Sequence, residues 1–393
     1  MPISILSRMG EKSGNSAWKT QWTTTVGDMM DDTFAYDDQQ PVCSIPDAPI
    51  LNLSDPSIAT RYEYNSVQSA LVTIIYPCIC LFGILTNSIF LLTVIRVPHM
   101  KNITNIYLSS LAVSDIMFLI TGTGFGLWRY LSTPVISDFS FLGGVHGCLI
   151  TQVLNSTPFY ASTLLVTVVA VERYLAICRP IHHRKINSRG RAFALIAVTW
   201  VVALCCEAML CPTVSDYTVK CVIWPNDDYF MEFPQTIGGC FYPALWAQIL
   251  TAFALIVPSL LAIFVTFILY ILIVRKLSKR IHKAPSEQTS NRAKSRRTRD
   301  HVAKMLITAG TVFYILLTPR TVVTIYYYIK SFAGTPGLPP GVEFILFTST
   351  NILLYVNSVT NPIMYAFSNK RYRTAFIQAF CPGSKMINVS SSS

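Results

Sequence analysis

The sequence predicts an all-α membrane protein: a seven-transmembrane helix bundle with a short amphipathic helix after the last span. Hydrophobic residues make up 52% of the 393 residues and charged residues only 13%, whereas soluble domains carry about 25% charged residues. Backbone groups in lipid must be hydrogen-bonded within the protein, so apolar runs of roughly 20 residues are expected to form membrane-spanning helices. Seven runs are long enough: 70–95, 104–128, 146–171, 192–211, 242–274, 302–329 and 344–367.

The basic residues predict the orientation of these spans. Of the 31 Lys and Arg residues, 22 lie in the connections after spans one, three and five and in the tail after span seven. The positive-inside rule places these segments in the cytoplasm and the N-terminus outside. No apolar core of signal-peptide length occurs in the first 30 residues, so span one is expected to act as an uncleaved signal anchor. The outer segments are acidic, with 15 acidic residues against 7 basic ones.

Composition divides the chain into three parts. Residues 1–66 are polar and rich in Thr, Asp and Pro, which predicts a disordered extracellular tail without a packed core. Residues 67–368 form the seven-transmembrane domain. Residues 369–393 form a cytoplasmic tail that begins with an amphipathic helix on the membrane lipid, because aromatic residues recur four apart with basic residues between them: Tyr372, Phe376 and Phe380.

Three sites of modification are expected. Cys381 follows the amphipathic helix and is a palmitoylation candidate. Asn52 lies in the Asn-Leu-Ser sequon of the outer tail and is the glycosylation candidate. Tyr36 is flanked by acids, as sulfated tyrosines are, and an unmodified tyrosine is the alternative.

Composition and motifs also exclude several functions. The basic charge is divided among loops between spans, so nucleic acid is not an expected partner. The sequence contains no nucleophile–base or metal constellation, and therefore no enzyme is predicted. A transporter is the rival from another class, but the paired repeats common in transporters are absent.

Ionisable residues within spans are functional candidates, because burying a charge in a membrane is costly. The candidates in or at the ends of spans are Asp115, Glu172, Arg173, Glu207 and Arg320.

Around these residues the sequence resembles the rhodopsin-like (class A) family of G-protein-coupled receptors. The motifs are "GILTN" (83–87), "SLAVSD" (110–115), "ERYLAICRP" (172–180), Trp200, Pro258 and "NSVTNPIMY" (357–365). Stretches from "KMLITAGTVF" onwards are similar to neuropeptide receptors of the thyrotropin-releasing-hormone and neuromedin-U group. The resemblance implies a plasma-membrane receptor that activates a heterotrimeric G protein by promoting nucleotide exchange, with arrestin and a receptor kinase as further partners. A peptide ligand, basic in charge, is expected; a non-peptide small molecule is the alternative.

The resemblance also implies an activation switch at the cytoplasmic side. Glu172 would hold Arg173 by a charge-assisted hydrogen bond in the resting state, and Pro180 and Ile181 would offer the G protein an apolar contact. The implied switch residues are Glu172, Arg173, Tyr174, Pro180, Ile181, Phe313, Pro319, Asn361, Pro362 and Tyr365.

Two further features follow from the resemblance. Residues matching an allosteric sodium site are Asp115, Ser162, Asn357, Ser358 and Asn361; a hydrated polar network is the alternative, and no other cofactor is expected. Of the four outer cysteines, Cys148 and Cys221 match a disulfide between helix three and the second outer loop, with Cys240 as the competing partner. Cys43 and Cys240 could then pair.

The sequence departs from the family at helix six and helix five. Leu316 and Leu317 occupy the places of a cysteine and a tryptophan before the helix-six proline, so the usual tryptophan lever is missing. Thr266 replaces a helix-five tyrosine, and Arg299 replaces a helix-six acid.

The expected ligand pocket excludes two ligand classes. Asn155 stands where amine receptors need an aspartate, and Tyr355 stands where opsins need a lysine. The expected partner of Arg320 is Glu207, or a polar network through Gln152, Asn155 and Asn351, or the terminus of the ligand. The pocket residues are Arg129, Gln152, Asn155, Phe159, Glu207, Arg320, Thr324, Tyr327, Phe347, Asn351 and Tyr355.

Overall fold

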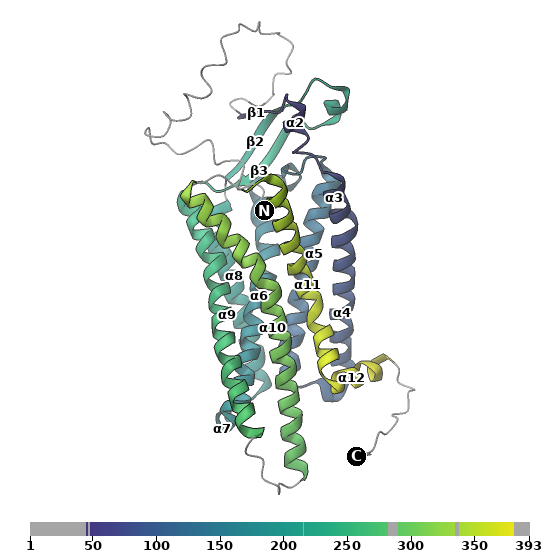
Figure 1. Cartoon of the computed structure of the whole chain (residues 1–393), viewed down its shortest axis with the longest axis vertical. Coiled ribbons are helices and arrows are strands. Elements are labelled where there is room, and N and C mark those ends of the chain that lie inside the picture. The colour runs from purple at the N-terminus through teal and green to yellow at the C-terminus, as the bar shows by residue number, and fades with distance from the viewer. Residues whose placement is uncertain (1–44, 46–47, 215, 282–289, 335–337, 381–393) are drawn as a thin grey trace.

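The computed structural model describes residues 45, 48–214, 216–281, 290–334 and 338–380, and within them the long helices form one bundle (Figure 1). Seven helical segments are long and apolar enough to cross a membrane, which confirms the seven predicted spans. The first begins with α3 (Ser66–Ala70) and one π-helical turn, Leu71–Ile75. The remaining long helices are α4 (Tyr76–Arg96), α5 (Ile103–Ser132), α6 (Val145–Cys178), α8 (Arg189–Leu210), α9 (Leu245–Ile281), α10 (Ser290–Ala333) and α11 (Pro340–Ser368).

Side-chain caps define where several helices begin. Asn65 and Gln68 form a reciprocal capping box at the start of α3. The Asn102 side chain accepts the Asn105 backbone N–H at the start of α5, and Ser188 does the same for Arg191 at the start of α8.

Small residues let the helices approach closely, as is common inside membranes. A Cβ atom at Gly83 of α4 would collide with Leu119 of α5, and one at Gly310 of α10 would collide with the Tyr270 hydroxyl of α9. The Trp200 indole of α8 donates to the Ser110 hydroxyl of α5 at 3.0 Å.

A three-stranded sheet covers one end of the bundle, here called the sheet end (Figure 1). Strands β2 (Asp216–Ile223) and β3 (Thr236–Phe241) form an antiparallel hairpin, and β1 (Ile50–Asn52) lies parallel to β2. Residues 48–65 therefore differ from the tail without a packed core that their composition predicts.

Buried apolar contacts explain why this part of the tail folds. Leu53 is only 1% exposed, and Ala59 of α2 (Pro56–Ala59) is fully buried. Both belong to an apolar cluster with Val135, Val222, Phe230 and Ile237. The tail is thus packed on the connection between α5 and α6 and on the connection between α8 and α9. Asn52 is exposed at the end of β1, where its side chain accepts the Ser54 backbone N–H; its glycosylation stays a prediction.

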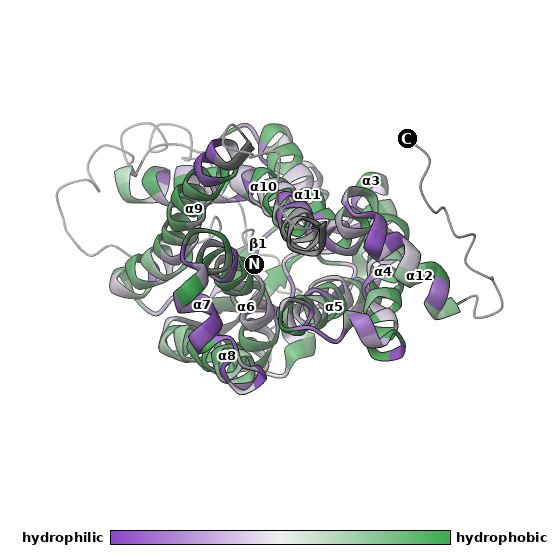
Figure 2. Ribbon diagram, turned by 90° about the horizontal axis from the view of Figure 1, so that it is seen from below, coloured by the Kyte–Doolittle hydropathy of each residue, from purple (hydrophilic) through white to green (hydrophobic). Residues whose placement is uncertain are grey.

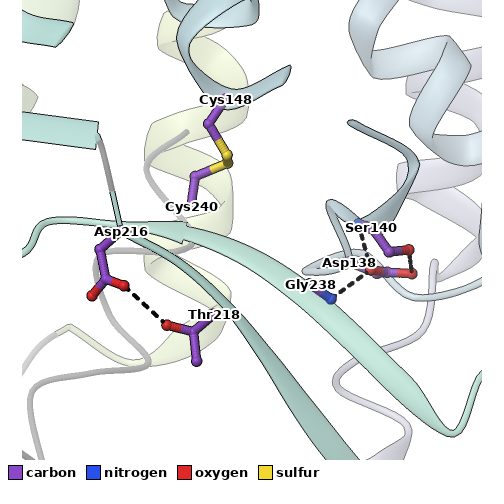
Figure 3. Close-up of a disulfide and its surroundings, with 7 residues drawn as sticks. All are labelled: Asp138, Ser140, Cys148, Asp216, Thr218, Gly238 and Cys240. Carbon is purple, nitrogen blue, oxygen red and sulfur yellow. Dashed lines mark hydrogen bonds between the residues drawn. A yellow bond between two sulfur atoms is a disulfide. The ribbon is translucent and has the colours of Figure 1, made fainter. Parts of the chain in front are cut away.

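The disulfide at the sheet end joins Cys148 of α6 to Cys240 of β3 (Figure 3), so the predicted Cys148–Cys221 pairing is wrong. The hairpin register gives the reason: Cys240 lies opposite Tyr217, near the end of β3 that leads into α9, whereas Cys221 lies opposite Thr236 further along. The suggested Cys43–Cys240 pair is excluded too, because Cys240 is already used. Cys221 is also disulfide-bonded, and Cys43 lies outside the described residues.

Asp138, in the connection after α5, fixes the same hairpin from the other side. Its carboxylate accepts the backbone N–H of Gly238 at 3.0 Å, and also the backbone N–H and hydroxyl of Ser140 (Figure 3). Charge-assisted bonds of this kind are stronger than neutral ones. The hairpin is therefore held both covalently to α6 and by hydrogen bonds to the loop after α5.

The opposite end, called the α12 end, carries α7 (Pro180–Ile186) and α12 (Lys370–Phe380). Helix α12 confirms the short helix predicted after the last span. Its Tyr372 is buried against Phe90 and Tyr365, and the Tyr372 hydroxyl donates to Asn105 Oδ1 at 2.5 Å. Arg96 lies over the Phe380 ring at the far end of the helix. Cys381, Tyr36 and the Arg299 side chain lie outside the described residues.

Candidate functional site

A small cavity of about 140 Å³ opens among the helices below the sheet end. Of the predicted pocket residues, Asn155, Phe159, Arg320 and Thr324 line it. Its other walls are formed by Phe118, Ser156, Leu255, Ile256, Ser259, Leu317, Thr321 and Leu354. The cavity is therefore mostly apolar with a few polar groups, as ligand sites usually are.

Arg320 follows Pro319 in α10 and brings a cation to this cavity. Its Nη1 atom is buried without a hydrogen-bond partner, and its guanidinium lies 5.4 Å from the Phe347 ring centroid. Phe347 in turn stacks on Tyr327 at 4.5 Å. Within the described residues Arg320 forms no ion pair.

Glu207 of α8 is fully buried, but it does not partner Arg320. One of its oxygens accepts the Gln152 amide at 3.2 Å, and the other has no partner. Gln152 also lies 3.3 Å from the Ser156 hydroxyl. The internal ion pair considered for Arg320 is therefore not formed, and Gln152 and Glu207 make a separate polar pair between α6 and α8.

The remaining predicted pocket residues lie around the cavity rather than in its wall. Arg129 is engaged at the sheet end, where it donates to the Tyr64 hydroxyl and lies over the Phe139 ring. Tyr355 packs between Tyr76 and Phe118. Asn351 is half-buried on α11. Four of the eleven predicted pocket residues therefore line the cavity.

A buried carboxylate network lies deeper in the bundle. Asp115 is fully buried, and it accepts the Ser162 hydroxyl at 3.1 Å and the Asn361 amide at 2.8 Å. Asn357 and Ser358 are buried on the same helix as Asn361, and Asn357 Oδ1 has no partner. One carboxylate with several neutral oxygens and an unused amide oxygen is a donor set that fits a monovalent cation.

Tyr314 of α10 is buried between α6 and α9, one turn from Leu317, which stands where the family has a tryptophan. Its hydroxyl lies 3.1 Å from the Thr167 hydroxyl of α6 and 3.2 Å from the Thr266 hydroxyl of α9. Thr266, which replaces the family's tyrosine, therefore has a structural contact: together with Tyr314 and Thr167 it links α6, α9 and α10 by hydrogen bonds. Phe313 packs beside Tyr314 in the same buried cluster, together with Leu317.

The C-terminal part of α11 carries three of the predicted switch residues. Pro362 stands inside the helix, and Tyr365 is buried with its ring 5.9 Å from Tyr372 of α12. The hydrogen bond of Asn361 to Asp115 connects the same turn to α5. Tyr365 therefore packs against α12, and Asn361 is hydrogen-bonded to α5.

At the α12 end, Glu172 and Arg173 do not bind each other as predicted. Glu172 is 3% exposed, and its two oxygens contact His183 Nε2 and Arg191 Nη2, both at 2.6 Å. Arg173 instead donates to the Thr104 hydroxyl of α5 at 2.7 Å. Neighbouring residues on a helix do not face each other, so Glu172 points to α7 and α8 while Arg173 points to α5.

The other predicted contacts of this end have clear positions. Pro180 is the first residue of α7, and Ile181 after it is 78% exposed. Tyr174 packs with Ile177 and Ile273 in a small cluster between α6 and α9. Ile181 is thus an apolar side chain exposed on the surface of α7.

Sequence reasoning missed three residues of this end: Thr104, His183 and Arg191. The dense basic run after the Glu-Arg-Tyr motif was the signal for two of them, because a buried carboxylate beside such a run requires a cation. Thr104 carried no signal of its own.

Comparison with known proteins identifies the family. The family described as 7 transmembrane receptor (rhodopsin family) matches residues 86–365. The chain is 30% identical to the thyrotropin-releasing hormone receptor of Bos taurus over 350 residues, covering 82% of this chain and 79% of the relative. It is 27% identical to neuromedin-U receptor 2 of Rattus norvegicus (80% and 76% covered) and 25% identical to somatostatin receptor type 2 of Mus musculus (84% and 82%). These relatives are receptors and not enzymes. The match over most of the chain, the seven spans and the motif residues in their places together show that the chain belongs to the rhodopsin family of seven-transmembrane receptors.

Proposed function

We propose that this receptor binds an extracellular peptide at the sheet end and activates a heterotrimeric G protein at the α12 end by promoting nucleotide exchange. The sheet end then faces the outside and the α12 end the cytoplasm of a cell with the receptor in its plasma membrane. The 22 Lys and Arg residues in the connections after spans one, three and five and in the tail after span seven support this orientation. The printed names of three relatives, receptors for somatostatin, neuromedin U and thyrotropin-releasing hormone, support a peptide.

The observation that carries the ligand proposal is the unpaired guanidinium of Arg320. A buried charge without a partner is costly, and the one carboxylate considered for it, Glu207, is held by Gln152 instead. A ligand oxygen from a C-terminal carboxylate or amide would satisfy the buried Nη1 atom. The planar fork of arginine binds such groups with two parallel hydrogen bonds.

The dimensions and charge of the sheet end suit the rest of a peptide. The cavity of about 140 Å³ has room for a terminal group rather than for a whole peptide. The remainder of the ligand would therefore contact the sheet and the outer loops. These segments are acidic, with 15 acidic residues against 7 basic ones in the tail and outer connections, so a basic peptide is favoured electrostatically.

The α12 end offers a G protein two kinds of contact. Ile181 supplies an exposed apolar side chain, and within the described part of the chain the Arg173 side chain donates a hydrogen bond to the hydroxyl of Thr104 alone. A single hydrogen bond to a neutral acceptor is worth about 1.5–3 kcal/mol when the donor is charged, so Arg173 can be released at modest cost. Arrestin and a receptor kinase are proposed to use the same face.

A sodium ion is proposed to bind at Asp115 as an allosteric ligand. Asp115, Ser162, Asn357, Ser358 and Asn361 would hold it, since they gather oxygen atoms of the hard type that such ions prefer. The ion would supply positive charge beside the buried carboxylate. The residues themselves connect α5, α6 and the C-terminal half of α11.

The test begins with a screen of amidated and free-acid peptides on cells that express the chain, read by calcium and cAMP. Arg320→Lys, which keeps the charge but loses the fork, is expected to weaken the potency of the active peptide at least about tenfold, equivalent to 1.4 kcal/mol. Arg320→Gln is expected to weaken it further. Arg61→Gln, an exposed cation of the sheet end, is the matched control and is expected to signal as the parent does.

Three outcomes would contradict parts of the proposal. If both Arg320 variants signal with parental potency at equal surface expression, the residue does not bind the ligand. If only a non-peptide compound is active, the peptide assignment is wrong while the receptor assignment stands. Accumulation of a labelled solute without any nucleotide exchange would instead identify a transporter.

A further inference from the structure

A second and larger cavity, of about 500 Å³, lies at the α12 end. Its walls come from the first residues of α5, α8 and α12, from the connection between α4 and α5, and from the ends of α6 and α7. Figure 2 views this end from below, with hydrophilic residues at α7, α8 and α12. We call it the cation cavity, because Lys101, Arg173, Arg189 and Arg371 all line it.

The cation cavity has far more positive than negative charge. Among the described residues Glu172 is the one carboxylate in its lining, and its two oxygens are already engaged by His183 and Arg191. Each of the three arginines is positioned by a neutral acceptor instead. Arg189 donates to the Lys101 carbonyl at 3.3 Å, and Arg371 donates to the His99 carbonyl at 2.9 Å.

Arg173 gives the independent indication of a ligand. It is 9% exposed, its single side-chain hydrogen bond within the described residues goes to the Thr104 hydroxyl, and its Nε atom is buried without a partner. An arginine carries five N–H donors and accepts none. Most of the donors of this side chain therefore remain available to an acceptor in the cavity.

The backbone adds to the same potential. Helices α5, α8 and α12 all direct their N-termini to the cavity, since the lining includes Ile103, Arg189 and Arg371 from their first turns. The partial positive charge of a helix N-terminus favours anions. Nearby, burial and then Arg371 hold the pKa of His99 below its ordinary value.

We propose that the cation cavity binds a ligand with more than one phosphate group, of the kind carried by phosphorylated inositol. Phosphate oxygens match the arginine fork, and cations on several walls require more than one anionic group to satisfy them. The site shares Arg173 with the G-protein contact proposed above but not its apolar part, because Pro180 and Ile181 are not in its lining. Such a ligand would accept hydrogen bonds from Arg173 inside the cavity. The source of the headgroup is either a membrane lipid or a free inositol phosphate.

The test uses the full chain in phosphatidylcholine nanodiscs at physiological salt. In one arm, fluorescent inositol 1,4,5-trisphosphate is titrated and its anisotropy measured. In the other, a fluorescent phosphatidylinositol 4,5-bisphosphate is added to the disc, and energy transfer between this lipid and a dye attached at the α12 end is measured. We expect saturable binding in at least one arm, and which arm responds identifies the source.

Variants then locate the site. Arg189→Gln and Arg371→Gln are each expected to weaken binding at least about tenfold, as for the loss of charge-assisted hydrogen bonds. Arg184→Gln is the matched control: Arg184 is an exposed cation of α7 that does not line the cavity, and its loss is expected to change affinity less than about threefold. Thermal unfolding checks that each variant is folded. The proposal is overturned if neither arm saturates, or if Arg184→Gln weakens binding as much as the two lining variants.

Discussion

Glu172 is expected to stabilise the α12 end by anchoring α7 and α8, and not by holding Arg173. The perturbation that tests this is Glu172→Gln, which keeps the shape of the side chain and removes its charge. Its two contacts at 2.6 Å are to His183 and Arg191, and none is to Arg173. The same phenotype is therefore expected from Arg191→Gln.

The magnitude follows from burial and from the number of bonds. A hydrogen bond to a charged group contributes about 1.5–3 kcal/mol, and leaving a buried charge without its partner costs about 3–5 kcal/mol. Arg191 and His183 keep some contact with solvent, with side chains 24% and 14% exposed, so the lower figures apply. We expect each single variant to lose about 1.5–3 kcal/mol, which lowers the melting temperature by several degrees.

A double-mutant cycle provides the assay. The melting temperatures of purified parent, Glu172→Gln, Arg191→Gln and the double variant give the coupling energy, expected to be about 1–3 kcal/mol. Arg184→Gln, an exposed position of α7, is the control and should melt with the parent. Basal nucleotide exchange is measured in parallel. If Glu172→Gln raises basal exchange while Arg191→Gln leaves both exchange and melting unchanged, Glu172 acts on Arg173 directly and the reasoning is refuted.

Four further predictions concern other parts of the bundle. Asp115→Asn should abolish any sodium dependence of agonist affinity; a parent receptor that binds equally in sodium and in a bulky cation would exclude the ion site. Tyr314→Phe removes the hydroxyl shared by α6 and α9 and should lower stability by about 1 kcal/mol in thermal unfolding, so unchanged melting would mean that these bonds are weak. Gly310→Leu inserts a side chain where α9 packs and should lower the yield of folded protein in size-exclusion chromatography, whereas an unchanged yield would show that α9 can move aside. Mass spectrometry of unreduced peptides should find Cys148 joined to Cys240; recovery of Cys148 with another cysteine would contradict the fold of the sheet end.

Hydropathy predicted the spans well, because lipid requires long apolar helices with internal hydrogen bonds. The aromatic spacing from Tyr372 also predicted α12. The strand Ile50–Asn52 could not be predicted, since three residues carry no periodicity and its partner β2 lies in a distant loop. The disulfide could not be chosen by counting cysteines. It depends on the register of the hairpin, which places Cys240 near α6.

The positions of the candidate site residues were predicted better than their contacts. Arg320 was expected in the pocket and lines it, yet its expected partner Glu207 pairs with Gln152. Sequence gives the depth of a residue along a helix but not the direction in which its side chain points across the bundle. Adjacent residues such as Glu172 and Arg173 illustrate this limit, because a turn of about 100° per residue sends them to different neighbours.

The parallel pairing of β1 with β2 has a consequence for biosynthesis. Ile50 pairs with Cys221, and four membrane spans separate the two strands in the chain. During translation the tail therefore emerges long before its partner exists, and it must wait unpaired while those four helices are inserted. The sheet can close only when the ribosome has passed β2. A tag or folding reporter placed before β1 would consequently report a late event in the maturation of the receptor, although it is attached to the part of the chain that is made first.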